Sequence, residues 1–342
     1  MKRNIVIGPP GTGKTTFLKN KVDKLINEGH CKPDEIGYFS FTVKAAEEIR
    51  DRVTKEEWSE DELKKMYPYF CTLHSLAYKR LQLQQSQIMD QYDYDDLSRL
   101  TGRVFVNKMK KGNGVDISMP TAKSEYQDII NLAYAKFPDK EDRLAKIFRE
   151  TTLNNYGARN MIEQMDLDLC KFKKDRDKYE YVDYFTQFLK RKNPPKLKYL
   201  FVDEAQDLSV HQWRVVDMIQ EIAKPIETYV AGDDDQAIFR WAGADIEHFI
   251  AMAKDDSNSI IPLTQSYRIP ISVHNLATKL AQSISVRIDK EYKPRDEEGV
   301  RKVLNIRPLN KGIKEGEWLI LCRTHEIVKQ VCESLEMYGW LY

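Results

Sequence analysis

The sequence lacks any pair of cysteines at a spacing that suggests a disulfide framework or a metal site. Its cysteines stand singly, at Cys31, Cys71, Cys170, Cys322 and Cys332. Scattered single cysteines are typical of reduced thiols in a cytoplasm, whereas zinc and iron–sulfur sites need closely spaced ligands. The sequence therefore predicts neither disulfide bonds nor a zinc or iron–sulfur centre.

The sequence also lacks an excess of charge of either sign, and it lacks a long apolar run. Lys and Arg total 54 against 53 Asp and Glu, so any nucleic-acid site must be local. No run of about 18 apolar residues is present, which argues against a membrane role, and residues 1–7 are too few for a signal peptide. With 342 residues, 42% of them hydrophobic, the chain is long enough for two or three domains.

Short β-rich runs alternate with helical stretches along the chain. The runs are residues 4–7, 36–41, 199–202, 228–231 and 318–322. This alternation predicts an α/β fold with parallel sheets flanked by helices. Between Lys79 and Tyr181 the sequence becomes polar and helical, without a comparable buried strand, which indicates an inserted helical subdomain.

Three basic stretches are candidates for a local nucleic-acid site. Residues 108–114 read KMKKGNG and predict a mobile basic loop, and residues 171–178 and 190–198 are also rich in lysine. Each stretch is equally compatible with lysines that are simply solvated at the surface.

The most informative stretch is residues 4–16, in which an apolar run leads directly into a glycine-rich loop and then into an amphipathic helical pattern. The loop comprises Gly8, Pro9, Pro10, Gly11, Thr12, Gly13, Lys14 and Thr15. The spacing G-x-x-x-x-G-K-T lets backbone N–H groups surround the β- and γ-phosphates of a nucleotide, because glycine side chains do not block the approach. Lys14 supplies a positive charge and the Thr15 hydroxyl a Mg²⁺ ligand. The sequence therefore predicts a nucleoside-triphosphate site.

Paired acids follow the apolar run at residues 199–202. Asp203 and Glu204 would lie at the carboxyl end of a strand, where a parallel sheet presents its ligand site. We expect Asp203 to hold Mg²⁺, directly or through water, and Glu204 to orient and deprotonate the attacking water. An exposed turn is the alternative for these acids taken alone.

A second polar turn follows the run at residues 228–231. Its Gln236 could reach the γ-phosphate or the attacking water. Phe239 and Trp241 flank Arg240, and such a cluster is compatible either with a hydrophobic core or with a platform on which the bases of a single strand stack.

Six segments, in this order, resemble the motifs of superfamily 1 DNA helicases of the UvrD/Rep/PcrA type: GPPGTGKT, FTVKAAEEIRDRV, TLHSLA, VDEAQD, GDDDQAIFRWAGA and LTQSYRIP. The amino-acid sequences of the fourth and fifth segments are most similar to those of short, phage-encoded helicases of this type. The resemblance implies a P-loop NTPase with a RecA-like domain (residues 1–78 plus 182–262), an inserted helical subdomain (79–181) and a partial second RecA-like domain (263–342). It further implies ATP and Mg²⁺ as cofactors and a cytoplasmic location, in the host if the gene is viral.

The resemblance also assigns roles at the nucleotide. Gln206 and Gln236 match residues that couple the γ-phosphate to the DNA site. Tyr267 matches an aromatic residue that packs on adenine, and Arg268 matches an arginine finger from the second domain. Thr16 stands where many relatives place an arginine near the base, and the upstream glutamine segment that reads adenine is not found before Gly8, so the resemblance leaves the choice of triphosphate open.

On the DNA side, the resemblance places Thr42, Thr72, His74 and Ser75 at the backbone of a single strand. Such contacts position the strand without reading its sequence. His74 could equally be a core histidine. The resemblance also favours Phe239 and Trp241 as base-stacking residues, and it implies single-stranded DNA, duplex junctions, and replication or repair proteins as partners.

The resemblance stops short of the family's last two motifs. We therefore expect the amino-terminal portion of a longer helicase, which binds ATP·Mg²⁺ and single-stranded DNA and is expected to travel 3′ to 5′. The hypothesis that follows is that the chain unwinds poorly or not at all by itself. The alternative function is an ATP-gated module that binds single-stranded DNA and recruits a partner without turnover.

Overall fold

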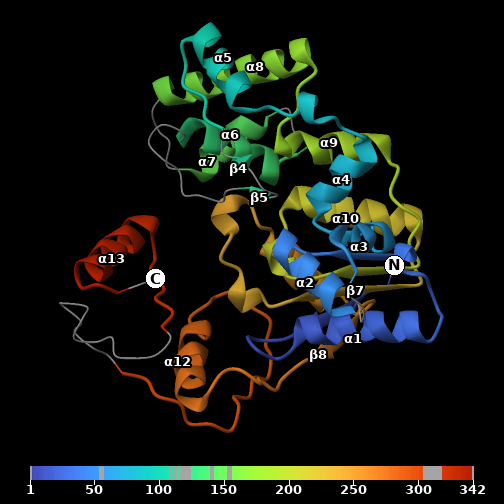
Figure 1. Ribbon diagram of the computed structural model, residues 1–342. Helices are drawn as coiled ribbons and strands as arrows, with labels where there is room; N and C mark the ends of the chain where they lie inside the picture. Colours follow the sequence, from blue (N-terminus) through green and yellow to red (C-terminus); the bar gives the residue numbers. More distant parts are fainter. Residues whose placement is uncertain are drawn as a thin grey trace.

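A sheet of six parallel strands lies at the centre of the computed structural model (Figure 1), in the order β3-β2-β6-β7-β1-β8. The structure describes residues 2–53, 58–107, 109–110, 114–115, 125–138, 142–151, 156–302 and 318–340. The strands are β1 (Asn4–Ile7), β2 (Ile36–Phe39), β3 (Phe70–Cys71), β6 (Tyr199–Val202), β7 (Glu227–Gly232) and β8 (Ser259–Pro262). Because β6, β7 and β1 are neighbours, the loops after them meet at one edge of the sheet.

The strands alternate side chains between two apolar faces, as the period of a β-strand requires. In β1, Ile5 and Ile7 belong to one core cluster and Val6 to the other. In β6, Leu200 likewise faces one cluster and Phe201 the other. Both faces are therefore covered, which explains why these strands read as nearly continuous apolar runs.

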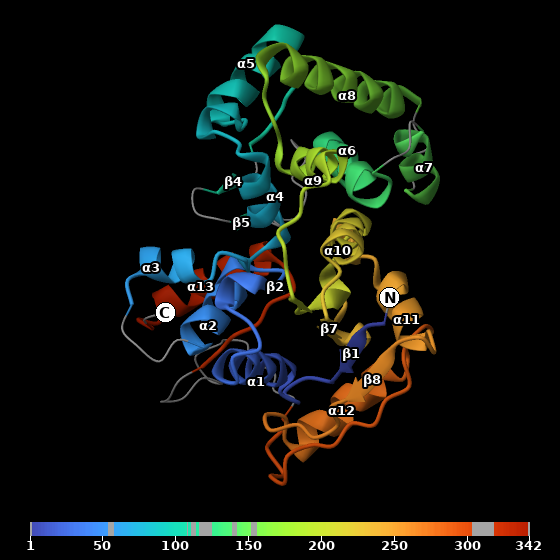
Figure 2. The same cartoon turned by 90° about the vertical axis from the view of Figure 1, so that its right-hand side faces the viewer.

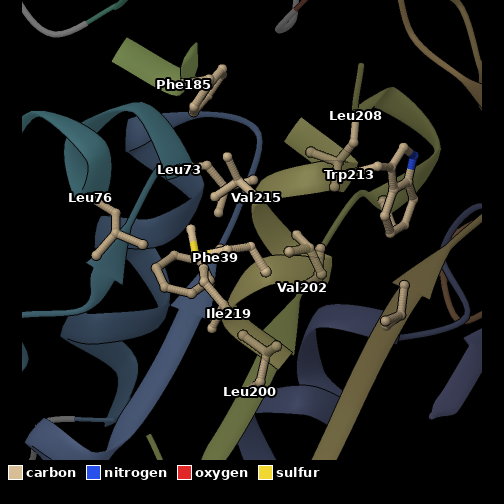
Figure 3. Packing of buried hydrophobic residues seen from close by; sticks show 14 of the residues in the cluster. Phe39, Leu73, Leu76, Phe185, Leu200, Val202, Leu208, Trp213, Val215 and Ile219 are labelled. Atoms are coloured by element: carbon tan, nitrogen blue, oxygen red, sulfur yellow. The ribbon is translucent and has the colours of Figure 1, made fainter. Parts of the chain in front are cut away.

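Helices cover both faces of the sheet. The face that contains Val6 packs against α1 (Lys14–Asn27), α2 (Val43–Val53) and α3 (Glu60–Met66). The opposite face packs against α4 (Leu73–Leu81), α9 (Tyr181–Arg191), α10 (Val210–Ala223) and α11 (Ile246–Lys254). Figure 3 shows the core on this opposite face, where Trp213, Val215 and Ile219 of α10 pack over Val202 and Leu200. Two 3₁₀ turns, η1 (Pro33–Glu35) and η2 (Gln85–Gln87), connect elements at the periphery.

Helices account for most of the described part of residues 79–181. They are α5 (Gln91–Thr101), α6 (Glu125–Lys136), α7 (Arg143–Glu150) and α8 (Tyr156–Arg176). They share a third apolar cluster, which includes Leu97, Ile130, Ile147 and Ile162 and contains no strand residue of the large sheet. Two two-residue strands, β4 (Met109–Lys110) and β5 (Gly114–Val115), pair here in antiparallel fashion, a feature the sequence did not indicate. Figure 2 shows these helices stacked beyond α10, at the end of the molecule away from α12.

The carboxyl-terminal residues form two described helices, α12 (Ile271–Ala281) and α13 (His325–Met337). The strand predicted at Trp318–Cys322 is wrong, because these residues have no regular secondary structure and Leu319 and Leu321 are each 84% exposed. Isolated apolar sequence does not make a strand, since the ladder needs a neighbour to accept its hydrogen bonds. In the described ranges, no β-ladder or isolated β-bridge includes residues 318–322.

The basic stretches contain several lysines that serve the fold. Lys173 is buried and bonds Glu180 and Asp183, and Lys178 bonds Asp93 at 2.7 Å. Lys198 pairs with Glu35 at 3.0 Å. Lys108 and residues 111–113 of the first stretch lie outside the described residues. Lys173, Lys178 and Lys198 are each occupied by an acidic partner, so they supply less free positive charge than the sequence alone indicates.

Candidate functional site

The glycine-rich loop joins the end of β1 to the start of α1. Gly11 and Gly13 have φ values of +75° and +82°, which side chains rarely tolerate. The Lys14 ammonium donates to the Gly8 carbonyl at 2.9 Å, and the Thr12 hydroxyl donates to the Pro9 carbonyl at 2.8 Å. The loop is thus folded around its own lysine.

The first turn of α1 leaves its N–H groups available for an anion. Its N-cap is Gly13, no side chain caps it, and no acidic residue lies in the first turn. Uncapped N–H groups and the positive end of the helix dipole together favour phosphate oxygens. The local structure therefore matches the phosphate site predicted from the loop spacing.

Thr15 and Asp203 meet at the edge of the sheet, although they are far apart in sequence. The Thr15 hydroxyl donates to Asp203 Oδ2 at 2.9 Å, and the buried Tyr38 hydroxyl donates to the same oxygen at 2.8 Å. Burial and the nearby Glu204 raise the pKa of Asp203. Burial and the second acid both disfavour the charged form of Asp203, so a bound cation would stabilise it.

These two oxygens fit a Mg²⁺ site in which the protein supplies few ligands. Among the described residues, no group of three His, Cys, Asp or Glu side chains is placed to hold a metal ion. Mg²⁺ bound at nucleotides commonly takes one or two protein oxygens and completes its shell with phosphate and water. Thr15 and Asp203 are the residues that would hold it, and the ion would neutralise charge on the phosphates.

Glu204 sits in a strained backbone conformation directly after Asp203. Its φ and ψ are 51° and 44°, the left-handed region that non-glycine residues seldom adopt, and it caps the 3₁₀ turn η3 (Ala205–Asp207). Gln206 Nε2 donates to Glu204 Oε2 at 2.8 Å. Strained residues of this kind gather at functional sites, where the surrounding structure fixes the direction of the side chain.

Asp233 joins the two predicted glutamines. The Asp233 N–H donates to Gln206 Oε1 at 3.1 Å, and Gln236 Nε2 donates to Asp233 Oδ2 at 2.6 Å. Gln236 ends the 3₁₀ turn η4 (Asp234–Gln236), which follows β7. Hydrogen bonds therefore run continuously from Glu204 through Gln206 and Asp233 to Gln236.

Tyr267 and Arg268 lie against the glycine-rich loop. The Tyr267 N–H donates to the Gly11 carbonyl at 2.9 Å, and a Cβ on Gly11 would come within 2.6 Å of the Arg268 Cβ. The Ser266 and Tyr292 hydroxyls both donate to the Pro10 carbonyl at 3.0 Å. Tyr267 is 75% exposed, which leaves room for a planar ligand to pack against it.

Sequence reasoning missed several residues of this site. Tyr38, Ser266 and Tyr292 contact it through chain segments whose proximity the sequence does not show. The segment VDEAQD includes Asp207, to which the sequence assigns no role, yet burial, followed by Glu204, raises the pKa of Asp207 to about 7. Its position at the end of an acidic turn after a buried strand was a usable signal.

The residues predicted to contact DNA have unequal environments. Thr42 is exposed and its hydroxyl caps α2 by accepting from the Ala45 N–H at 3.2 Å. The Thr72 hydroxyl accepts from the Ser75 N–H at 3.2 Å, so both residues form the N-terminal cap of α4. Thr16 is exposed in the first turn of α1. Their contacts with ligands stay predictions.

His74 and Phe239 belong to aromatic pairs. The His74 ring stacks on Tyr181, with ring centroids 3.4 Å apart, and burial followed by the charge of His211 lowers its pKa well below the usual value. His74 is half-buried between Tyr181 and Phe185, so both its predicted DNA contact and the core-histidine alternative stay open to test. Phe239 stacks on Phe41 with centroids 5.2 Å apart. Trp241 is the middle residue of the 3₁₀ turn η5 (Arg240–Ala242), and its side chain is not among those that the structure describes.

The arrangement would suit in-line phosphoryl transfer to water. Lys14 and the uncapped start of α1 would attract phosphate oxygens, and the Glu204 carboxylate, bonded to Gln206, is the group that would act as a base. Arg268 offers a cation from a segment that packs on the loop. Chemistry of this type depends mainly on position and charge.

Comparisons with known proteins give an independent result. Residues 1–257 match the family described as the UvrD/REP helicase N-terminal domain. The chain is 26% identical to the ATP-dependent DNA helicase Rep of Buchnera aphidicola subsp. Acyrthosiphon pisum (strain APS), over 93% of this chain and 52% of that protein. It is 26% identical to the ATP-dependent DNA helicase PcrA of Bacillus subtilis (strain 168), over 87% of this chain and 40% of that protein.

A third relative, the ATP-dependent DNA helicase PcrA of Staphylococcus aureus (strain Mu50 / ATCC 700699), is 23% identical over 84% of this chain and 39% of its own length. The chain thus spans about half the length of these relatives or less. Within the described ranges, no helix has the length and apolar character to cross a bilayer. The family match covers β1, β2, β3, β6 and β7, the glycine-rich loop and the segments of Glu204 and Gln236, and the chain accordingly belongs to the UvrD/Rep helicase family.

Proposed function

We propose that this chain is the ATP-hydrolysing part of a DNA helicase or translocase that moves 3′ to 5′ on single-stranded DNA. One observation carries the proposal: residues 203–207, 233–236 and 267–268, which are far apart in sequence, meet at the glycine-rich loop or in the hydrogen-bond network beside it. UvrD-family helicases use ATP and Mg²⁺, and the pairing of Thr15 with Asp203 suits both.

In the proposed cycle, ATP occupies the loop between β1 and α1. Lys14 binds the phosphates, Glu204 activates water, and Gln206 and Gln236 sense the γ-phosphate. Arg268 reaches the γ-phosphate only when its segment is held against Gly11, so hydrolysis depends on domain placement. Thr42, Thr72 and His74 hold the DNA backbone, and Phe239 and Trp241 stack on bases.

We further propose the domain division expected from the sequence. Residues 1–78 with 182–262 carry the sheet and its helices, and residues 79–181 carry the third apolar cluster. Residues 263–342 would form part of a second RecA-like domain; the described part of this range holds two helices and no strand of the large sheet.

A second function is an ATP-gated module that binds single-stranded DNA without turnover. The glycine-rich loop and the hydrogen bonds around Glu204 would serve such a module equally well. The two proposals share the nucleotide site and differ in whether hydrolysis occurs in the chain alone.

ATP hydrolysis with and without single-stranded DNA separates the two. We expect DNA-stimulated turnover in the unaltered chain and a fall in kcat of about 100-fold or more in Glu204→Gln, because a base contributes about that much. Affinity for a non-hydrolysable ATP analogue should stay within about 3-fold, since Glu204 acts on water rather than on binding.

Glu221→Gln is the matched control, because Glu221 is exposed on α10 and should leave turnover unchanged. Nucleotide binding without turnover would establish the gated module instead. Turnover that persists in Glu204→Gln would contradict the assigned base.

A further inference from the structure

Residues 284–293, which follow α12, cross back to the turn after β7. We name Asp233, Asp234 and Asp235 the aspartate turn. The Lys290 ammonium bonds Asp233 Oδ1 at 2.7 Å and Asp235 Oδ2 at 3.0 Å, and it also pairs with Asp234. One cation thus contacts three consecutive carboxylates.

This cluster is removed from solvent. The side chain of Lys290 is 6% exposed, that of Asp233 0% and that of Asp234 1%. Arg287 adds a second cation through two bonds to Asp235, at 2.9 and 2.6 Å, and the Ile288 N–H donates to Asp234 Oδ2 at 2.6 Å. Buried carboxylates are costly without a partner, so removal of Lys290 would leave the aspartate turn unstable in its present position.

The aspartate turn continues directly into the network around Glu204. Asp233 uses one carboxylate oxygen for Lys290 and the other for Gln236, whose amide donates at 2.6 Å. Its backbone N–H bonds Gln206, which in turn donates to Glu204. Lys290 is therefore separated from the proposed catalytic base by Asp233 and Gln206 alone.

Residues close to Lys290 in the chain are also bound to the segment of Arg268. Gln265 and Lys293 form a parallel bridge, in which the Ser266 N–H donates to the Lys293 carbonyl at 2.8 Å and the Lys293 N–H to the Thr264 carbonyl at 2.9 Å. Tyr292 bonds Pro10 of the glycine-rich loop. The short run from Lys290 to Lys293 thus connects the aspartate turn, the loop and the strand-like segment that precedes Arg268.

We propose that Lys290 is a positioning residue. Its ion pair with Asp233, which we call the clamp, holds Gln206 and Gln236 in fixed positions relative to the Arg268 segment. The inference rests on the proposed ATP hydrolysis and extends it. Residues 290–293 contact both the aspartate turn and the segment before Arg268. A shift of residues 264–293 would therefore also change the geometry at Glu204. Burial alone would lower the pKa of Lys290, but Asp233 and its neighbours outweigh this effect and raise it, so the clamp keeps its charge.

Three variants test the clamp: Lys290→Met, Lys290→Arg and the control Lys293→Met. Lys293 is 56% exposed in the same run, and its side chain pairs only with Glu291 in the described part of the chain. For Lys290→Met we expect kcat to fall about 10-fold or more with KM for ATP within about 3-fold, because misplacement affects the transition state more than binding. Lys290→Arg should be intermediate, since a planar guanidinium cannot sit among three carboxylates as an ammonium does.

Hydrogen exchange supplies a readout that does not need hydrolysis. In Lys290→Met, amides of residues 232–239 should exchange faster, while those of β1 and α1 keep their protection. A merely structural role would instead raise exchange throughout the sheet and change kcat and KM together. Either that pattern or wild-type behaviour of Lys290→Met would overturn the proposal.

Two further outcomes keep the tests separate. If the unaltered chain does not hydrolyse ATP, the proposed function fails, but exchange at residues 232–239 still decides whether Lys290 holds the turn. If Lys290→Met does not fold, Lys290→Arg takes its place: a kcat about 3-fold lower at constant KM supports the clamp, and a wild-type kcat overturns it.

Discussion

At the residue scale, the acids after β6 differ from ordinary surface acids. Asp203 and Asp207 flank Glu204 within one turn, and burial together with the charge of Glu204 raises the pKa of each. Asp207 Oδ1 is buried and has no hydrogen-bond partner among the residues that the structure describes. The hydrogen bond from Gln206 and the charge of Lys14 act in the opposite direction on the pKa of Asp207, so nucleotide phosphates that engage Lys14 would favour the protonated acid.

Asp207 gives a prediction for pH dependence. Its pKa is about 7 in the folded chain and about 3.9 in an unfolded one. The folded state therefore binds this proton more tightly, so the stability it contributes is complete below pH about 4 and is lost as pH rises through about 7. Without nucleotide, the free energy of unfolding of the wild type should fall relative to that of Asp207→Asn across this window.

Urea unfolding at several pH values between about 5 and about 8 measures the difference. Asp175→Asn, at an exposed position in α8, is the control and should show the wild-type pH dependence. A constant difference between the wild type and Asp207→Asn would show that Asp207 does not titrate in this range.

At the element scale, α5, α6, α7 and α8 pack mainly on one another. Ile162 of α8 is fully buried in their cluster, whereas Met161, its neighbour on the same helix, is 42% exposed. In Figure 1 these helices lie on the far side of α10 from α1. A substitution that destabilises this cluster should therefore leave nucleotide binding unchanged.

Ile162→Ala should lower the free energy of unfolding of this region by about 2–4 kcal/mol, through lost burial and the cavity left behind. Met161→Ala should change it by less than about 0.5 kcal/mol, as is usual at exposed positions. Hydrogen exchange across α5–α8 measures both, with binding of an ATP analogue as a second readout. Weaker nucleotide binding in Ile162→Ala would show that the helical region and the sheet are coupled.

At the scale of the whole molecule, the nearly balanced charge leaves recognition to local sites. A ligand that binds only the folded chain stabilises it by mass action, by about 2.7 kcal/mol at 100 times its Kd. We expect a non-hydrolysable ATP analogue with Mg²⁺ to raise the unfolding temperature accordingly. Lys14→Ala should abolish the rise, because the loop loses its phosphate-binding charge.

Lys24→Ala is the matched control on α1, since Lys24 is 65% exposed and should leave the rise intact. A thermal scan with increasing analogue measures all three proteins. An equal rise in Lys14→Ala would place the nucleotide elsewhere.

The strands that carry the site were predictable because their apolar runs are unambiguous. β1 and β6 have the predicted bounds, and β2 ends two residues early, at Phe39. β3 and β8 were missed, because two residues at 70–71 and a half-exposed run at 259–262 carry too weak a pattern. Residues 318–322 were misassigned because β-propensity matters only where a partner strand exists.

The sequence by itself determined the glycine-rich loop, the acidic pair after β6 and the family, because these depend on local spacing and on the order of motifs. Only the tertiary structure decided that Tyr38 bonds Asp203, that Tyr267 lies on Gly11 and that Lys290 is buried among the aspartate turn. The reason is physical: these contacts join segments distant in sequence, and packing of the sheet and of residues 284–293 fixes them. From sequence alone, a lysine in a charged run is expected to be exposed, and only the folded structure shows that Lys290 is buried.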